Sequence, residues 1–521
     1  MVLESLTILL ATLASRVIVA KQQEPAFDVH GHLYFAQTLA EQRAGPFGSI
    51  TMKVVGASGF TQPFMWHWLI GRFDSQFIRM RQAWLNALVD AVFVCAAFVL
   101  TRLAGFGNEE ALLAVAVYLL TPMWFSSLAI GPRIAGFTPR LSAEVATNLF
   151  FLLTLLPVDL PSPWVFAAAV LLAAFVLSSS KFGVQAMLLM APLAGALAGR
   201  PLPVAALAAA VILLVIASRG RALAQLQAQL AHLGWYFREN LRGRMHVSDR
   251  NSVRALLRTT GASRADRFAR TLYRAVGENS YTAVALKMPI LGLLTYAAIA
   301  AGIGVYTGGL RPLAAPVAAG VVLFLLINLR PLLFLGEAER YLNHVAWFIA
   351  LLAARVAMEH SLQWALAAIL AYGLGFWLLE SFALPRLTPL RMRQRAREDA
   401  AIIGDLRQRM PPDVVLCYPY HAGGGAWRVM AETPHQVVYC FGLNADFARR
   451  FNEQYAAAYP CVRLDRLDEM ADEYQIGYLV VDRRELATRG LADWAPSERW
   501  TRLPLGGEIY EVFTRTRAAV P

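Results

Sequence analysis

Long apolar runs recur along the chain, separated by short polar turns. A bilayer core about 30 Å thick takes about 20 apolar residues in one helix. Runs of roughly this length predict eleven membrane spans, at about residues 5–20, 84–104, 110–128, 141–157, 163–179, 182–199, 202–217, 284–306, 313–329, 344–358 and 362–383. The first run has no basic segment before it and opens an array of spans, which favours a retained helix over a signal peptide. The pattern is typical of an α-helical polytopic integral membrane protein.

Three longer stretches are not membrane-like: residues 21–83, residues 218–282 and everything from about 385 onward. An even number of predicted spans separates them, so all three are expected on one side of the membrane. The chain is therefore predicted to hold a transmembrane domain, residues 1–385, and a soluble domain, residues 386–521. The first large loop is 21–83, and 218–282 forms a second, basic loop.

The last stretch predicts a small α/β domain. Runs rich in β-branched and aromatic residues predict strands at Asp413–Tyr418, Gln436–Phe441, Ile476–Val481 and Glu508–Phe513. Helical patterns such as Asn444–Ala457 fall between them. The segment His421–Trp427 holds three adjacent glycines but lacks both GxGxxG spacing and a P-loop lysine, which favours a flexible loop over a phosphate site.

Composition agrees with the pattern. Of 521 residues 57% are hydrophobic and only 16% are charged, with a mean hydropathy of +0.46, so no soluble fold could hide so much apolar surface. The net charge is +12, and 44 of the 48 basic residues are arginine, largely a sign of GC-rich codons. Arginine is nevertheless the side chain best shaped to bind phosphate. The four cysteines include no CxxC pair, so neither a zinc site nor a disulfide framework is predicted.

The basic loop carries twelve arginines and four acidic residues. Arg250, Arg254 and Arg258 recur at helical spacing, which favours helices lying in the headgroup layer and held by anionic lipid. Basic residues in the short loops are nearly balanced between the two sides, whereas the arginines that follow the last span favour the cytoplasm. Charge alone therefore leaves the orientation of the chain open.

A compact set of polar residues follows the first span. Residues 29–43 predict a helix, because Val29 and Leu33 belong to an apolar stripe and a Gly-Pro-Phe-Gly sequence ends it. At about 100° per residue, Asp28 and His32 share one face, whereas His30 points nearly the opposite way. Asp28 is thus a carboxylate that an imidazole can orient. It is equally well placed to be the N-cap of the helix.

Ionisable residues also mark the turns between predicted spans on the same side as Asp28. Such residues near a span are functional candidates. They are Arg133, Arg140 and Glu144 around a proline-broken helix end, Lys181 in a hairpin, and Glu337, Arg340 and Tyr341 in a later turn.

The order of these features resembles the GT-C superfamily of polytopic glycosyltransferases, which take sugars from polyprenyl-phosphate lipids. In that superfamily the loop after the first helix carries a catalytic acid, and the segment Asp28–Leu39 is similar to the pattern around it. The segment after Pro63, the proline-broken span after Thr121 and the lysine-bearing hairpin Ser178–Gly183 are also similar. The resemblance covers most of residues 1–385, without identifying a subfamily.

The resemblance implies that Asp28 is the catalytic base of an inverting transfer from a polyprenyl-phosphate-linked sugar. The acceptor would be an envelope glycan, a lipid or a protein, and the site and the soluble domain would face the periplasm of a bacterial inner membrane. Many members carry two adjacent acids where this chain has Asp28 alone, so a divalent metal is left open and no metal ligand is assigned. Membrane lipids are expected partners and nucleic acids are not.

Sugar transfer needs a base for the acceptor hydroxyl, cations for the departing phosphate and an apolar groove with stacking surfaces. Asp28 is the candidate base. The candidate substrate-binding residues are His30, His32, Arg133, Arg140, Glu144, Lys181, Glu337, Arg340 and Tyr341. Trp66, Trp68 and Trp124 could stack on sugar but are better explained as an aromatic belt. His67 and His344 are expected at the membrane interface.

Two other classes remain. A transporter or flippase of lipid-linked or anionic substrates would use the basic turns without chemistry, although no internal repeat supports it. A non-catalytic membrane scaffold would use the soluble domain to recruit a partner.

Overall fold

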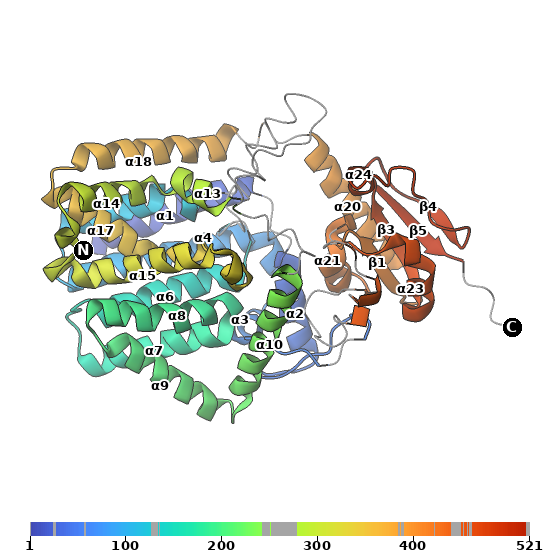
Figure 1. Cartoon of the computed structure of the whole chain (residues 1–521), viewed down its shortest axis with the longest axis horizontal. Coiled ribbons are helices and arrows are strands. Elements are labelled where there is room, and N and C mark those ends of the chain that lie inside the picture. Colours follow the sequence, from blue (N-terminus) through green and yellow to red (C-terminus); the bar gives the residue numbers. More distant parts are fainter. Residues whose placement is uncertain are drawn as a thin grey trace.

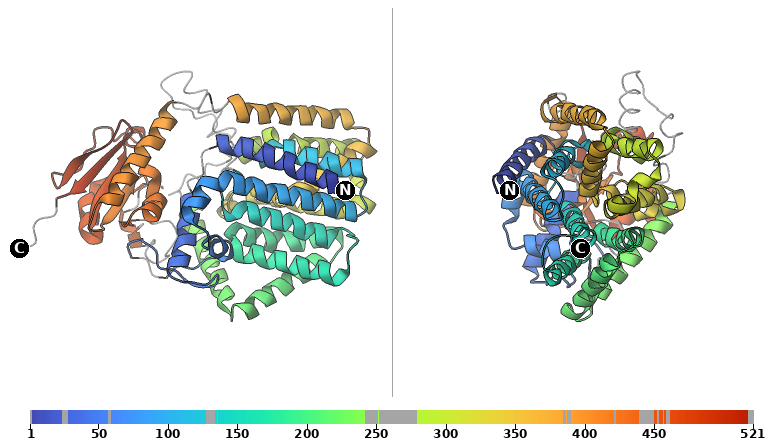
Figure 2. Two further views of the ribbon diagram at one scale, coloured as in Figure 1. Left: turned by 180° about the vertical axis from the view of Figure 1, so that it is seen from behind. Right: turned by 90° about the vertical axis from the view of Figure 1, so that its left-hand side faces the viewer.

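The computed structural model describes residues 2–23, 28–56, 59–126, 134, 136–241, 251, 279–383, 386, 390–420, 422–438, 450–451, 453–455, 457 and 461–516. A bundle of roughly parallel helices makes up most of the chain, and a smaller part with a sheet lies beyond one end of it (Figure 1). The back and end views in Figure 2 show the same separation. The predicted fold class, a helical membrane protein with a small C-terminal sheet, is confirmed.

Each of the eleven predicted spans coincides with helix. Six helices in the described part are long and apolar enough to cross a membrane by themselves. They are α1 (Val2–Gln22), α4 (Ser75–Leu103), α7 (Ser162–Ser179), α8 (Lys181–Ala198), α15 (Arg311–Ile327) with the turn before it, and α18 (Gln363–Leu378) with the π-helical turn Leu379–Ala383.

Two bent helix pairs raise the number of candidate spans to as many as eight. Helix α9 (Leu202–Ala217) turns by 114° into α10 (Arg221–Leu241), and α13 (Ser280–Lys287) meets α14 (Pro289–Ala300) at 84°. The first bend occurs at Arg219 and Gly220, which both have positive φ. Helix α10 therefore runs across the bundle instead of along it (Figure 1).

The remaining predicted spans are short helices. They are α5 (Asn108–Leu120, 13 residues), α6 (Pro139–Leu155, 17 residues) and α17 (Ala346–Glu359, 14 residues). Residues Ala346 to Ala354 of α17 are all buried, so protein surrounds this helix. An apolar run thus marks burial in the bundle as well as burial in lipid.

A buried polar cluster joins the first helices of the bundle. Arg16 on α1 pairs with Asp90 on α4 at 2.7 Å, and Tyr118 donates to Asp90 at 2.6 Å. The Arg16 guanidinium also donates to the main-chain carbonyls of Tyr118 and Leu119. The end of a helix leaves its last carbonyls without partners, and α5 ends here because Pro122 follows. Arg16 thus supplies donors where the proline breaks the helix.

The C-terminal region, residues 390–516, holds a five-stranded mixed sheet of order β2-β1-β3-β5-β4. The strands are β1 (Val414–Tyr418), β2 (Gln436–Val437), β3 (Ile476–Asp482), β4 (Trp500–Gly506) and β5 (Tyr510–Arg515). Strand β1 pairs in parallel with β2 and β3, whereas β5 is antiparallel to β3 and β4. The helices that pack around the sheet in the described residues include α20 (Leu390–Gln408), α21 (Gly425–Glu432), α23 (Leu467–Tyr474) and α24 (Arg483–Thr488).

The sequence predicted strands at the positions of β1, β2, β3 and β5, and missed β4. Strand β4 lies at the edge of the sheet and includes Arg502 and Pro504, which weaken the strand pattern. The helix predicted at Asn444–Ala457 lies largely outside the described residues, as does the end of the strand candidate Gln436–Phe441.

The three adjacent glycines do not form the flexible loop that the sequence favoured. Gly423, Gly424 and Gly425 have φ values of 63°, 82° and 78° and lead directly into α21. A Cβ on Gly423 would lie 2.7 Å from Val480 Cγ1, so the turn is packed closely against β3. Glycine is needed here for both its left-handed φ and its lack of a side chain.

The polar stretches meet at one end of the bundle, as predicted from the even number of spans. The Gln225 amide of α10 donates to the Pro46 carbonyl of the first loop at 2.9 Å. Val54 of the first loop forms a parallel bridge with Val437 of the C-terminal region. This end of the bundle, where the predicted site residues also lie, is called the site end below.

Candidate functional site

Two helices of the first loop, α2 (Asp28–Glu41) and α3 (Met65–Ile70), lie at the site end (Figure 1). Their mutual face buries Val29 and Leu33 against Trp66 and Ile78. Asp28 is the first residue of α2, and its side chain is exposed.

Two histidines from different helices form a pair beside Asp28. His32 Nδ1 on α2 lies 2.8 Å from His67 Nε2 on α3, and their rings stack with centroids 5.1 Å apart. The pKa of His32 is lowered to about 4, mainly by burial and also by the Arg140 and Lys181 cations, against the Asp28 carboxylate, which raises it. Burial also lowers the pKa of His67 well below its usual value. Both rings are therefore neutral at pH 7, and the tautomer of one fixes that of the other.

Cations from two separate turns, Arg140 and Lys181, act on His32, and a third cation, Arg340, interacts with Arg140. Arg140 and Lys181 both lower the pKa of His32. Arg140 in turn interacts electrostatically with Arg340, Glu337, Glu144 and Asp28. Arg140, Lys181 and Arg340 are called the cation turns below.

The chain places two of the cation turns at helix N-termini. Arg140 is the second residue of α6, where the Thr138 hydroxyl accepts a hydrogen bond from the Arg140 amide. Lys181 is the first residue of α8, and the Ser180 hydroxyl accepts from the Gly183 amide as its N-cap. A helix N-terminus carries partial positive charge and unsatisfied N–H groups. The helices therefore add to the positive field of their own side chains.

The third cation turn packs directly against the second. Arg340 pairs with Glu337 three residues earlier and lies 5.4 Å from the centre of the Phe182 ring. Phe182 also contacts Tyr341 with ring centroids 4.9 Å apart. Lys181 lies 5.3 Å from the centre of the Phe60 ring, which links this hairpin to the first loop.

Helix α6 holds the Arg340 turn in place through buried hydrogen bonds. The Asn148 amide donates to the Asn343 carbonyl at 2.9 Å, and the Trp347 amide donates to Asn148 Oδ1 at 3.0 Å. Asn343 donates to the Glu144 carboxylate at 3.4 Å. Glu144, predicted to bind substrate, is 1% exposed and serves this anchoring network. The described site thus depends on α6 for both a cation and its support.

Most of the predicted site residues that the structure describes gather at one place, but His30 does not. His30 lies on the other face of α2, where its Nδ1 is 3.6 Å from the Glu432 carboxylate of α21. Arg133 lies outside the described residues. Tyr341 is fully buried beneath the Arg340 turn, so it supports that turn without being exposed.

Several aromatic residues have roles that the sequence did not predict. Trp66 and Trp124 are 3% and 0% exposed, so they belong to the protein core and not to an aromatic belt. Trp124 stacks on Tyr118 with centroids 4.9 Å apart. His67 and His344 are each 1% exposed instead of lying at the interface, and His344 Nδ1 contacts the Thr147 hydroxyl at 3.0 Å. The apolar residues on both sides of Trp66 and His67 in the sequence were the available signal that these two side chains are buried.

The carboxylates and imidazoles do not form a metal site in the part of the chain that the structure describes. No group of three or more His, Cys, Asp and Glu side chains there is placed to hold a metal ion. His32 Nδ1 and His67 Nε2 lie only 2.8 Å apart, which leaves no room for a metal ion between these two nitrogens. We therefore assign no step of the chemistry to a metal.

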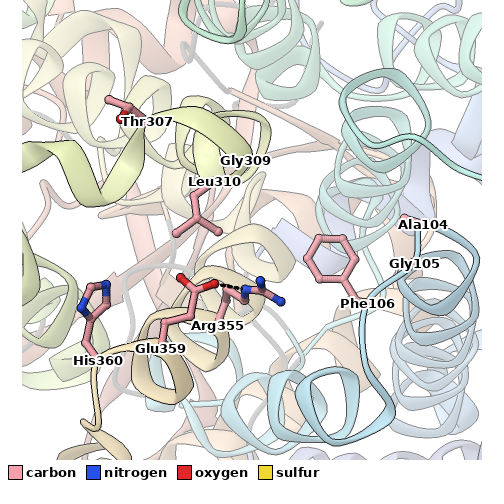
Figure 3. A pocket seen from close by; sticks show the side chains of 9 residues that line it. All are labelled: Ala104, Gly105, Phe106, Thr307, Gly309, Leu310, Arg355, Glu359 and His360. Atoms are coloured by element: carbon pink, nitrogen blue, oxygen red, sulfur yellow. Dashed lines mark hydrogen bonds and ion pairs between the residues drawn. The ribbon is translucent and has the colours of Figure 1, made fainter.

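A cavity of about 460 Å³ opens elsewhere on the bundle. It is lined by Ala104, Gly105 and Phe106 after α4, by Leu310 and by the end of α17, with Arg355 paired to Glu359 at its centre (Figure 3). None of the predicted site residues lines it. Arg355 also pairs with the buried Glu110, so its charge is already neutralised by two carboxylates.

No protein-family model matches the sequence, and no curated protein is significantly similar to it. Among solved structures, ArnT from Cupriavidus metallidurans bound to undecaprenyl phosphate aligns over 98% of this chain and 98% of its own, with a TM-score of 0.56 and 11% identity. AglB from Archaeoglobus fulgidus, an archaeal oligosaccharyltransferase bound to an inhibitory peptide and dolichol-phosphate, covers 99% of this chain and 75% of its own, with a TM-score of 0.46 and 13% identity. The mycobacterial arabinofuranosyltransferase AftD covers 98% of this chain and 40% of its own, with a TM-score of 0.44 and 16% identity.

Only the first of these similarities is strong enough to bear on the chain, and at 11% identity it establishes the fold alone. That fold is the one that the sequence predicted, because ArnT belongs to the GT-C superfamily of membrane glycosyltransferases.

Proposed function

We propose that this chain, which has the GT-C fold, transfers a sugar from a polyprenyl-phosphate-linked donor to an envelope glycan, lipid or protein. The observation that carries the proposal is the grouping at the site end, where Asp28 interacts with His32 and Arg140, Lys181 interacts with His32, and Arg340 interacts with Arg140. ArnT, the structure of the same fold, was solved with undecaprenyl phosphate bound. A carboxylate opposed by several cations suits a reaction that releases a proton and a phosphate anion at neighbouring atoms.

In the proposed reaction, the acceptor oxygen attacks the anomeric carbon as the bond from that carbon to the phosphate oxygen breaks. The electron pair of the broken bond leaves with the polyprenyl phosphate, and the proton of the acceptor hydroxyl moves to the Asp28 carboxylate. A single displacement of this kind inverts the configuration at the anomeric carbon. Asp28 is exposed, so an acceptor can approach it from outside the protein.

The cation turns would stabilise the charge that develops on the departing phosphate. Lys181 and Arg340 come from adjacent turns and Arg140 from the start of α6, so a phosphate among them would meet positive charge from three elements. Groups fixed in advance around a developing charge do not need to reorganise during the reaction, which is usually the largest contribution to catalysis.

The histidine pair would add no further positive charge to the site. His32 and His67 are neutral at pH 7 because burial lowers the pKa of both. A neutral His32 adds no further cation beside Asp28. The contact between His32 Nδ1 and His67 Nε2 leaves Nε2 of His32 as its remaining hydrogen-bonding atom.

We further propose that the site end faces the periplasm of a bacterial inner membrane, as in the superfamily that the sequence resembles. The test is a cysteine at exposed Glu41, introduced after the four native cysteines are replaced. Labelling by a membrane-impermeant maleimide in intact spheroplasts supports the periplasmic orientation. Labelling only after the membrane is opened contradicts it.

The experiment for the function itself uses purified protein and a polyprenyl-phosphate sugar labelled in the sugar. Transfer predicts release of free polyprenyl phosphate together with label in an acceptor fraction. A transporter would instead move the intact labelled lipid across the membrane of a proteoliposome. Movement of the lipid without release of polyprenyl phosphate would overturn the proposal.

A further inference from the structure

Helix α2 makes contacts on two faces, and only one of these faces takes part in the proposed chemistry. Asp28 and His32 face α3 and the cation turns, whereas His30 and Gly31 face α21 of the C-terminal region. The second face therefore concerns the C-terminal region, for which neither the sequence nor the proposed chemistry supplies a role.

The indole of Trp427 lies directly on the backbone of α2. A Cβ on Gly31 would come within 2.8 Å of Trp427 Cδ2 and within 3.0 Å of Cε2, so only glycine permits this approach. One turn further along α2, Phe35 meets the same indole at 5.2 Å between ring centroids. Phe35 also stacks on Phe60, the ring that Lys181 approaches. The aromatic contacts thus connect the C-terminal region to a cation turn through α2.

Glu432, the last residue of α21, joins the C-terminal region to α4 by an ion pair and to α2 by a contact with the His30 imidazole, which is neutral at pH 7. Its carboxylate lies 3.0 Å from Arg79 of α4 and 3.6 Å from His30 of α2. Arg428, one turn earlier on α21, contacts it at 2.9 Å. The Glu432 side chain is only 5% exposed, which protects these ion pairs from solvent.

Hydrogen bonds to main-chain groups also join the first loop to the C-terminal region. The Lys53 ammonium donates to the carbonyls of Met430 at 3.3 Å and Thr433 at 3.0 Å, near the C-terminal end of α21. The amide of Val437 donates to the Lys53 carbonyl at 3.0 Å, so the first loop extends the edge of the sheet beside β2. The Lys53 amide in turn donates to the Tyr34 hydroxyl of α2 at 2.7 Å.

We infer that the C-terminal region holds α2 in the orientation that directs Asp28 toward the cation turns, with Trp427 and Glu432 as positioning residues. The inference rests on the proposed function for its catalytic consequence. A helix of 14 residues is marginally stable by itself in water, and most of its stability must come from packing. Contacts with the bundle stabilise one side of α2, and Trp427 and Glu432 stabilise the other side.

The test uses the full-length protein in detergent and measures hydrogen exchange of the peptide that covers residues 28–41. Trp427→Ala and Glu432→Gln are each expected to raise the exchange rate of this peptide by about tenfold, because the first removes packing on one face of α2 and the second removes the charge that pairs with Arg79 and Arg428. Trp427→Phe retains an aromatic ring and is expected to restore most of the protection. Glu469→Gln is the matched control, since its carboxylate pairs with Arg466 on the far side of the sheet.

Activity, with kcat expressed per mole of folded protein, adds a readout that loss of stability alone would not move. The cation turns belong to the bundle, so the KM for the lipid donor is expected to change less than twofold while kcat falls by about tenfold. If Trp427→Ala does not fold, Gly31→Ala disturbs the same contact from the α2 side and is expected to give the same increase in exchange.

The inference and the proposed function can fail separately. Unchanged exchange of residues 28–41 in Trp427→Ala and Glu432→Gln would overturn the positioning role, whatever the activity. A clear increase in exchange with kcat unaffected would overturn the link between position and catalysis. Failure of every form of the protein to release polyprenyl phosphate would overturn the proposed function and leave the exchange result to stand by itself.

Discussion

His32 Nδ1 lies 2.8 Å from His67 Nε2, and this contact joins two helices of the first loop directly beside Asp28. Both rings are kept neutral mainly by burial. A neutral pair shares one proton across the contact, so His67 determines which nitrogen of His32 is a donor. His67 is therefore expected to act on the site through His32.

Replacing His67 with phenylalanine retains a ring of similar shape but leaves His32 Nδ1 without its partner. We expect kcat to fall by about tenfold, with a change in melting temperature of only a few degrees. Steady-state kinetics and thermal unfolding in detergent measure the two effects. His360→Gln, which alters an exposed histidine among the residues that line the cavity of Figure 3, is the control and should change neither.

Acid is expected to destabilise the site end. The folded pKa of His32 is about 4 against 6.5 for an unperturbed histidine. Between these values the unfolded chain binds more protons than the folded one, so the free energy of unfolding falls as the pH falls from 6.5 towards 4. His30, whose pKa burial also lowers to about 4, acts in the same direction. The stabilising contribution is fully present only above pH 6.5.

The measurement is the melting temperature between pH 7 and pH 4.5, compared in wild type and in His32→Gln. The variant cannot take up that proton, so its melting temperature should fall less steeply with acid. Identical pH dependence in the two proteins would show that His32 does not carry the effect.

Removing one cation turn should impair both binding and chemistry. Lys181→Met keeps the length of the side chain but removes its charge, and we expect kcat/KM for the lipid donor to fall by about a hundredfold. Arg200→Gln, at the opposite end of α8, removes a cation away from the site and is expected to have no such effect. Equal losses in the two variants would indicate a general effect of net charge.

The buried pair of Arg16 and Asp90 is expected to matter for stability and not for chemistry. Asp90→Asn leaves the Arg16 charge buried without its counterion, which costs about 3 kcal/mol or more of unfolding free energy. Combining it with Arg16→Met should recover much of the loss. Thermal unfolding of the single and double variants provides the comparison, and additive losses would contradict the coupling.

Periodicity and residue type were enough to predict the elements that carry the site. The apolar stripe of α2 and the positions of the spans follow from local pattern, and an even count of spans brings the three polar stretches to one end. The cation turns Arg140 and Lys181 could be named because each begins a helix after a short polar turn.

Contacts between distant segments could not be predicted in this way. The pairing of His67 with His32 and of His30 with Glu432 depends on how α2 packs, and a single sequence contains no record of that packing. The buried positions of Trp66 and Trp124 were missed because an aromatic residue at a span end suits an aromatic belt and a protein core equally well. The close packing of Gly423 against Val480, which explains the need for glycine there, likewise could not be predicted from the sequence.

The central claim is that Asp28 accepts the proton of the acceptor during sugar transfer. Turnover of the labelled polyprenyl-phosphate sugar by Asp28→Asn tests it most directly, with Glu41→Gln at the other end of α2 as the matched control. We expect Asp28→Asn to melt like the wild type and to lose release of polyprenyl phosphate by about a thousandfold, while Glu41→Gln retains it. Wild-type turnover in a folded Asp28→Asn protein would contradict the account.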